Sequence, residues 1–196
     1  MGVPLIIAEP TGLYRRDLRR FTYGSRGTPC PGRVQGQFPM GHDATATIEY
    51  IPEAAAELVH GDNWPREDER WPSQCENCDY HFADADEWQR NDLKMYRRPD
   101  GFEFAHWGSL AAVPPGTMWR LPWADAHFSV RHPQHVESWC VALPDGGQWI
   151  TSQGASGGGF WTVNGTPPAI DVNPSIWHSQ PDGWHGFIRN GEMVDA

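Results

Sequence analysis

Short apolar segments separated by turn residues fill the C-terminal half of the chain. The segments are ESWCVALP, GQWITS, GFWTV, PPAIDV and HGFIRNGEMV, and clusters of Pro, Asp, Asn and Gly stand between them. Segments of this length with tight-turn residues between them are typical of antiparallel strands. The pattern predicts a small antiparallel sheet or open barrel over residues 102–196.

The N-terminal half contains one clear strand pattern and one helix pattern that follows it. Residues 41–51, GHDATATIEYI, alternate between two sets of positions, which predicts a half-buried strand. Pro52 at a helix start, an Ala/Glu/Leu run and Gly61 beyond it predict a short helix over 52–60.

A second short helix is predicted to begin at Asp84. Glu87 follows three residues later, as in a capping box, and the apolar contacts come from Trp88, Leu93, Met95 and Tyr96. Upstream, the apolar start MGVPLII predicts a strand, and the arginine-rich LYRRDLRRF that follows it would be short if it were helical. We therefore expect a mainly β protein, of the α+β type with two short helices.

Composition agrees with this fold class and limits the partners. The chain has 196 residues, with 21 Gly, 18 Pro and 11 Trp, which favours turns and aromatic packing over long helices. The net charge is −10, so the chain lacks the basic face that binds nucleic acid. Five arginines gather near the start and predict a basic arm over residues 1–27, suited to an acidic protein surface, or else a solvated face: Arg15, Arg16, Arg19, Arg20 and Arg26.

The cysteines are expected to be reduced. The apolar run at the start is too short and wrongly flanked for a signal peptide or a membrane span, which predicts a cytosol-like compartment and no membrane contact. Four cysteines in such a compartment indicate a metal site or free thiols before disulfides.

Cys75 and Cys78 form a Cys-x-x-Cys pair, the spacing that supplies two of the four ligands in many structural zinc sites. Cys30, followed by Pro and Gly, and His42, just before the predicted strand, supply two further ligands. Because closed structural zinc sites take four ligands in a tetrahedron, the sequence predicts a ribbon-like site with three cysteines and one histidine. This site would define a zinc-binding subdomain over 28–101, packed on a β-rich domain over 102–196.

Three substitutes in this ligand set stay open. His81 lies three positions after Cys78, and His60 is a further candidate for the place of His42. Cys140 is the substitute for Cys30, although its apolar neighbours favour a buried free thiol. The remaining alternative is that the cysteines bind no metal.

The predicted Zn²⁺ would be structural, because four protein ligands leave no open position for water. No phosphate-binding glycine motif and no Gly-x-Ser-x-Gly nucleophile motif occur in the chain. We therefore expect no enzyme and no catalytic residues.

Two Trp-His pairs form the main competing feature. They are Trp177-His178 and Trp184-His185, and a hairpin would bring the two histidines together beside Asp171 or Asp182 as a second metal site or general base. The competing interpretation is cross-strand aromatic packing. Other tryptophans are candidate contact anchors or core residues, namely Trp64, Trp71 and Trp107.

Five blocks of the chain resemble a family of proteins without assigned function from tailed phages and prophages, often encoded near head and tail genes. The blocks are CPG…GHDA, RWP…C..C.Y.FADADEWQ, VPPGTMWRLPW, VALPDGGQWITS and W.V.GTPPAI.V.PSI……WHGFIRNGE, within residues 28–194. The resemblance implies metal-ligand character at Cys30, His42, Cys75 and Cys78, and it implies no activity.

The function expected from these features is that of a non-catalytic virion protein, a capsid, decoration or head-tail component, located in the virion and in the host cytoplasm during assembly. Its expected partners are the major capsid or neck and tail proteins of a symmetric assembly, bound through the arm and exposed aromatics. The alternative is a metal-dependent enzyme or nucleic-acid accessory protein that uses His178 and His185.

Overall fold

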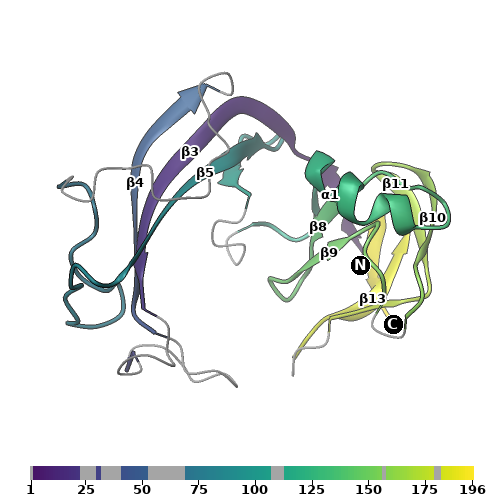
Figure 1. The fold of residues 1–196 in the computed structure, drawn as a ribbon. Helices are drawn as coiled ribbons and strands as arrows, with labels where there is room; N and C mark the ends of the chain where they lie inside the picture. The colour runs from purple at the N-terminus through teal and green to yellow at the C-terminus, as the bar shows by residue number, and fades with distance from the viewer. Residues whose placement is uncertain are drawn as a thin grey trace. The chain divides into compact units, whose positions relative to one another are not determined.

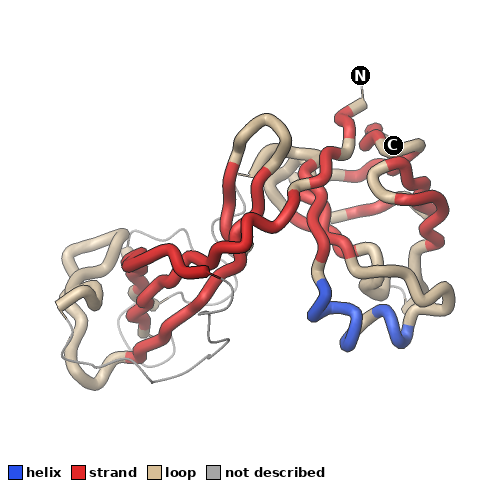
Figure 2. The backbone as a smooth tube through the Cα atoms, turned by 90° about the horizontal axis from the view of Figure 1, so that it is seen from above, coloured by secondary structure: helices blue, strands red, loops and turns tan. Residues whose placement is uncertain are grey.

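Strands dominate the described part of the chain, and one α-helix lies among them (Figure 2). The structure is a computed structural model that describes residues 2–22, 30–31, 41–52, 69–106, 113–155, 158–178 and 182–196, without the side chains of 48, 49 and 51. The mainly β class expected from the sequence is confirmed. The helix predicted over 52–60 lies outside the described residues, except for Pro52 at the end of a strand.

The chain forms two compact units that interleave in sequence. The inserted unit is Gly12–Met95, and the terminal unit combines Met1–Thr11 with Tyr96–Ala196. The sequence predicted boundaries after residues 27 and 101, whereas the two compact units divide after Thr11 and after Met95. The prediction assigned the first residues to a separate arm and so did not group them with the C-terminal strands.

Long curved strands build the inserted unit: β3 (Glu9–Phe21), β4 (Asp43–Pro52) and β5 (Glu87–Arg97). Figure 1 shows them bending together, and the sheet has the order β4-β3-β5-β6, with β6 at Glu103–Ala105. The alternating segment at 41–51 therefore forms the predicted strand. It is antiparallel to β3, with a register shift between Arg16 and Asp17.

The helix predicted from Asp84 is wrong, because this segment forms β5. Asp86 accepts the backbone N–H of Ala83 at 2.7 Å in a turn that leads into the strand. Two side chains of this segment contact arginines of β3. The Arg20 guanidinium lies 3.6 Å from the centre of the Trp88 ring, and Arg16 forms an ion pair with Asp92 at 2.8 Å. These cross-strand contacts outweigh the helix propensity of the local sequence.

The arginine-rich segment is part of β3 and is not helical. Its arginines bind groups within the inserted unit: Arg15 contacts Asp17 at 2.7 Å, and Arg19 contacts Asp43 at 2.6 Å. Arg20 donates to the carbonyl of Ala83. A segment with charges on both sides of a strand can be buried only if each charge has such a partner.

Short strands and turns build the terminal unit, as the C-terminal pattern predicted. Its remaining strands are β1 (Val3–Pro4), β2 (Ile6–Ile7), β7 (Thr117–Arg120), β8 (Trp139–Ala142), β9 (Gln148–Ile150), β10 (Thr162–Thr166), β11 (Ala169–Asn173), β12 (Ile176–Trp177), β13 (His185–Arg189) and β14 (Glu192–Asp195). They form sheets of order β1-β14-β13-β12, β2-β7-β8-β9 and β10-β11. The pairing of β2 with β7 is parallel and the other registered pairs are antiparallel.

Apolar side chains from both ends of the chain fill the core of the terminal unit. Leu5, between β1 and β2, packs in one cluster with Met118, Trp149, Ile188 and Met193. A second cluster surrounds the fully buried Trp119. The apolar run at the N-terminus is therefore part of this core, through β1 on β14 and β2 on β7.

The helix α1 (Pro122–His127) has a signal that the sequence interpretation did not use. Pro122 occupies the first turn, where a missing N–H breaks no helical hydrogen bond. A 3₁₀ turn at Ser129–Arg131 follows. Among the described residues, no helix combines the length and apolar character needed to cross a membrane.

Candidate metal centre

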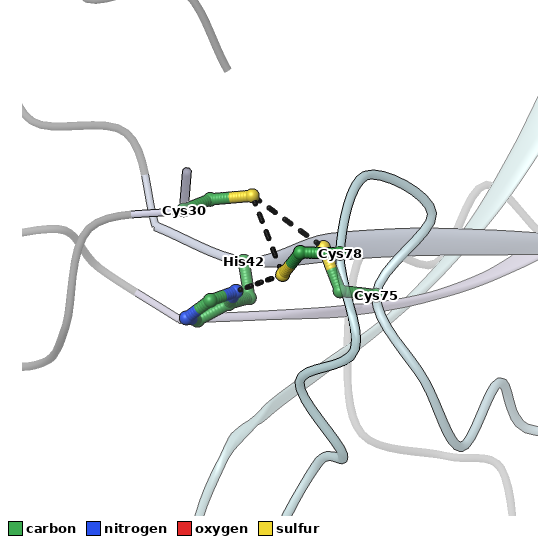
Figure 3. Close-up of side chains that lie close together, drawn as sticks. All are labelled: Cys30, His42, Cys75 and Cys78. Atoms are coloured by element: carbon green, nitrogen blue, oxygen red, sulfur yellow. Dashed lines mark hydrogen bonds between the residues drawn. The ribbon is translucent and has the colours of Figure 1, made fainter. Parts of the chain in front are cut away.

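Four predicted ligands come together in the inserted unit. Cys30, His42, Cys75 and Cys78 place one ligand atom each within 4.8 Å of all the others. Cys30, His42 and Cys75 are buried, and Cys78 is half-buried. Figure 3 shows the three sulfurs and one nitrogen of His42 pointing toward a common centre.

The separations between these atoms resemble the edges of a coordination tetrahedron. The Cys30 sulfur lies 3.8 Å from that of Cys75 and 3.7 Å from that of Cys78. Zn–S bonds of about 2.3 Å in a tetrahedron place two sulfurs about 3.8 Å apart. Nδ1 of His42 lies 3.2 Å from the Cys78 sulfur, slightly below the roughly 3.5 Å of such a site. The spacing and donor types fit a four-coordinate metal ion.

Two hydrogen bonds to Thr22 hold the backbone of His42 in place. Its N–H donates to Oγ1 of Thr22 at 2.9 Å, and its carbonyl accepts the N–H of Thr22 at 2.9 Å. The preceding Gly41 allows this approach, because a Cβ there would lie 1.7 Å from the Thr22 carbonyl oxygen. The end of β3 thus holds the ligand at the start of β4.

A narrow loop carries Cys75 and Cys78. Gln74 and His81 form an antiparallel bridge at its base, and the N–H of Cys75 donates to the carbonyl of Tyr80 at 2.9 Å. The N–H of Glu76 donates to the carbonyl of Asp43 at 3.0 Å, which attaches the loop to β4. This arrangement turns both sulfurs toward Cys30 and His42.

Hydrogen bonds to the sulfur of Cys75 favour the thiolate that a metal requires. Burial acts to raise the pKa of Cys75, but backbone donors at Asn77 and Asp43 and the side chains of His42 and Cys30 lower that pKa to about 6. At Cys78 a backbone bond at Tyr80 acts to lower the pKa, whereas burial and the two neighbouring thiols raise it. The surroundings of Cys75 therefore favour the form of the thiol that binds a metal.

Two of the three alternative ligands, His81 and Cys140, do not join this group. His81 is exposed, and among the described residues the group of possible ligands holds only the four named above. His60 lies outside the described residues. Cys140 is fully buried in the terminal unit, where its sulfur lies 3.2 Å from Oε1 of Gln148 and burial raises its pKa.

The hairpin of Trp-His pairs forms, but it separates its two histidines. Trp177 is paired with His185 in the β12–β13 register, whereas His178 donates its backbone N–H to Trp184. Because directly opposed residues share one face of a sheet, His178 and His185 lie on opposite faces.

The carboxylate that binds His178 is Asp145. Its Oδ2 lies 2.6 Å from Nδ1 of His178, and the expected partners Asp171 and Asp182 do not make this contact. Nε2 of His185 is 3.0 Å from the hydroxyl of Ser175. Asp145 lies 33 residues before His178, in a Pro-Asp-Gly-Gly turn that the sequence marked only as a strand connection.

The tryptophans proposed as anchors differ in exposure. Trp71 is buried and packs edge-on against Trp88 at 4.8 Å, so it is not a surface contact residue. Trp64 and Trp107 lie outside the described residues. The exposed tryptophans of the described part are Trp123 and Trp177, 42% and 68% exposed.

Comparison of the chain with protein-family models, with curated proteins and with solved structures found no match.

Proposed function

We propose that the protein is a non-catalytic structural protein whose Cys30, His42, Cys75 and Cys78 bind Zn²⁺. The observation that carries this proposal is the convergence of three sulfurs and one imidazole nitrogen within 4.8 Å, with the Cys30 sulfur 3.8 and 3.7 Å from the other two. Soft thiolate ligands with one imidazole select zinc over the hard cations, which prefer oxygen.

The ion would cross-link three separate segments of the inserted unit. Its ligands come from three places in the chain, and the segments between them are long, so one ion closes large loops. Four protein ligands complete the coordination sphere and leave no position for a reacting water. The role that follows is stabilisation of the sheet at the β3–β4 end.

The biological setting that we propose is the virion of a tailed phage, as a capsid, decoration or head-tail component. The support is the resemblance of five sequence blocks to a family encoded near head and tail genes. The proposed partners are other virion proteins in a symmetric assembly, with the exposed Trp123 and Trp177 as contact residues. The arginines Arg15, Arg16, Arg19 and Arg20 bind groups within the chain, so the proposal assigns contact to the aromatics rather than to these arginines.

Metal analysis of the purified full chain tests the first part. We expect about one zinc per chain, an unchanged ratio in Cys140→Ser, and loss of most of the zinc in Cys78→Ser. Cys140→Ser is the matched control because Cys140 lies in the other unit. A metal-free wild-type chain purified without chelator, which also takes up no added Zn²⁺, would contradict the site.

Mass spectrometry of particles from a phage that encodes this protein tests the second part. We expect the protein in purified particles, and reduced incorporation for Trp177→Ala with the soluble protein still folded. Absence of the protein from particles that assemble normally would contradict the virion role and leave the zinc site untouched.

A further inference from the structure

The ring of Tyr80 lies flat against the ring of the ligand His42. The ring centroids are 3.8 Å apart and the planes differ by 4°. Tyr80 follows Cys78 by two residues, so the loop that carries two sulfur ligands also carries the surface on which the imidazole rests. The backbone of the same residue accepts the N–H of Cys75.

Tyr80 is itself held in place. Its hydroxyl donates to Oδ2 of Asp86 at 3.1 Å, and the same oxygen accepts the N–H of Ala83. Phe82 meets the Tyr80 ring edge-on at 5.6 Å, and Arg20 of β3 stacks over Phe82 at 5.2 Å. The ring position is therefore determined by the turn at 83–86 and by the sheet.

The stacked arrangement fixes the plane of the His42 ring beside the metal site. Nδ1 points to the Cys78 sulfur, whereas Nε2 is buried and has no hydrogen-bond partner among the described residues (Figure 3). An imidazole that ligates a metal is usually oriented by a hydrogen bond to its other nitrogen. Among the residues that the structure describes, the contact that orients the ring is the aromatic face of Tyr80.

We propose that Tyr80 is a positioning residue for the metal site, which holds the His42 ring so that Nδ1 is the ligand atom. The inference rests on the proposed zinc site. With its backbone fixed by Thr22 and its ring fixed by Tyr80, His42 loses little freedom when the ion binds. Without the Tyr80 ring the imidazole turns more freely, and the entropy lost on binding rises.

Zinc competition with a chromophoric chelator, together with Co²⁺ absorption spectra, measures this effect on the full chain. We expect Tyr80→Leu to raise the Kd for zinc about 10- to 100-fold and to change the Co²⁺ ligand-field bands. Tyr80→Phe keeps the ring and should stay within about threefold of the wild type. Tyr50→Leu, the same change at a 60% exposed position of β4, is the matched control and should leave the Kd unchanged.

A second background separates positioning from general stabilisation. In His42→Cys the fourth ligand is a sulfur, and four cysteines also bind zinc. Tyr80→Leu should then alter the Kd by less than about threefold, because no imidazole remains to be oriented. An equal loss in both backgrounds would show that Tyr80 only supports the fold and would overturn the proposal.

Nuclear magnetic resonance of the zinc-loaded wild type tests the geometry without a substitution, so the proposal stays testable if Tyr80→Leu does not fold. We expect metal ligation at Nδ1, a proton on Nε2, and upfield shifts of the His42 ring protons from the Tyr80 ring current. Ligation through Nε2 would overturn the inference alone. A wild-type chain that binds neither Co²⁺ nor Zn²⁺ would overturn the proposed zinc site, and this inference with it.

Discussion

Arg16 of β3 and Asp92 of β5 form a two-pronged ion pair, with Nε to Oδ1 and Nη2 to Oδ2 both at 2.8 Å. The side chains are 11% and 1% exposed, so water screens the pair very little. Such a pair joins two strands that are far apart in sequence, and its removal leaves a buried charge without its partner.

We predict that Asp92→Asn lowers the free energy of unfolding of the inserted unit by about 3–5 kcal/mol, because Arg16 then keeps a buried charge. Urea unfolding followed by circular dichroism measures the change. Glu103→Gln is the control: it breaks the Arg97–Glu103 pair, whose side chains are 59% and 43% exposed, and should cost less than about 1 kcal/mol. A loss for Asp92→Asn no larger than that of the control would show that the buried pair contributes little.

Removal of the metal should loosen one unit and leave the other intact. On addition of a chelator, we expect faster hydrogen exchange at the N–H groups of Thr22, Cys75 and Glu76, which all bond at the site. The N–H of Thr151, bonded to Trp139 in the terminal unit, should exchange at an unchanged rate. Equal protection at all four amides with and without chelator would speak against a metal cross-link.

The Asp145 carboxylate should make the terminal unit sensitive to acid. Burial acts to raise its pKa, but the N–H groups of Trp184 and Gly147 and the ring of His178 lower it below the ordinary value. The contribution is fully present above the pKa of the unfolded chain, about 4, and is lost as the pH falls through the lower folded value.

Asp145→Asn should therefore destabilise the unit by about 2 kcal/mol at pH 7 and flatten the stability curve below about pH 4. Thermal unfolding between pH 2 and 7 measures both effects. Asp182→Asn, at an exposed turn, provides the comparison and should follow the wild type. An unchanged acid limb in Asp145→Asn would remove the assigned role.

His106 should produce a second pH effect in a different range. It is buried, its Nδ1 accepts Nε1–H of Trp119 at 3.1 Å, and burial lowers its pKa to about 4. The unfolded chain takes up a proton near pH 6.5 and the folded chain does not, so stability falls between about pH 6.5 and 4 by roughly 3 kcal/mol.

His106→Asn keeps an acceptor for Trp119 and loses this titration. We expect a flatter stability curve between pH 4 and 6.5, measured by urea unfolding at intervals across that range. The curve below pH 4, which depends on Asp145, should keep its slope in this variant. A wild-type slope between pH 4 and 6.5 would mean that His106 is not the group responsible.

The cluster of four candidate ligands could be predicted because its signal in the sequence is local. Two cysteines three positions apart need only one tight turn to share an ion, and Cys30 and His42 are the remaining donors with turn residues or a strand start beside them. The short strands of the terminal unit were equally visible, since Pro, Asp and Gly clusters mark their ends.

Contacts between segments that are distant in sequence explain the wrong helix prediction and the residues whose roles were not predicted. The segment from Glu87 to Arg97 is rich in good helix formers and follows an apparent cap, whereas its contacts with the arginines of β3 favour a strand. The roles of Tyr80 and Asp145 could not be predicted from the sequence. Tyr80 acquires its role through contact with His42, and Asp145 acquires its role through contact with His178, 33 residues away.

The chain leaves the terminal unit along β3 and returns along β5, and these are neighbouring strands of one sheet. Residues 12–95 are therefore one continuous insertion into the terminal unit, which contains the first and the last residues of the sequence. The pairings of β1 with β14 and of β2 with β7 lie wholly outside residues 12–95. All four residues of the candidate metal site lie within this insertion, so the site and the terminal core are built from separate stretches of the chain.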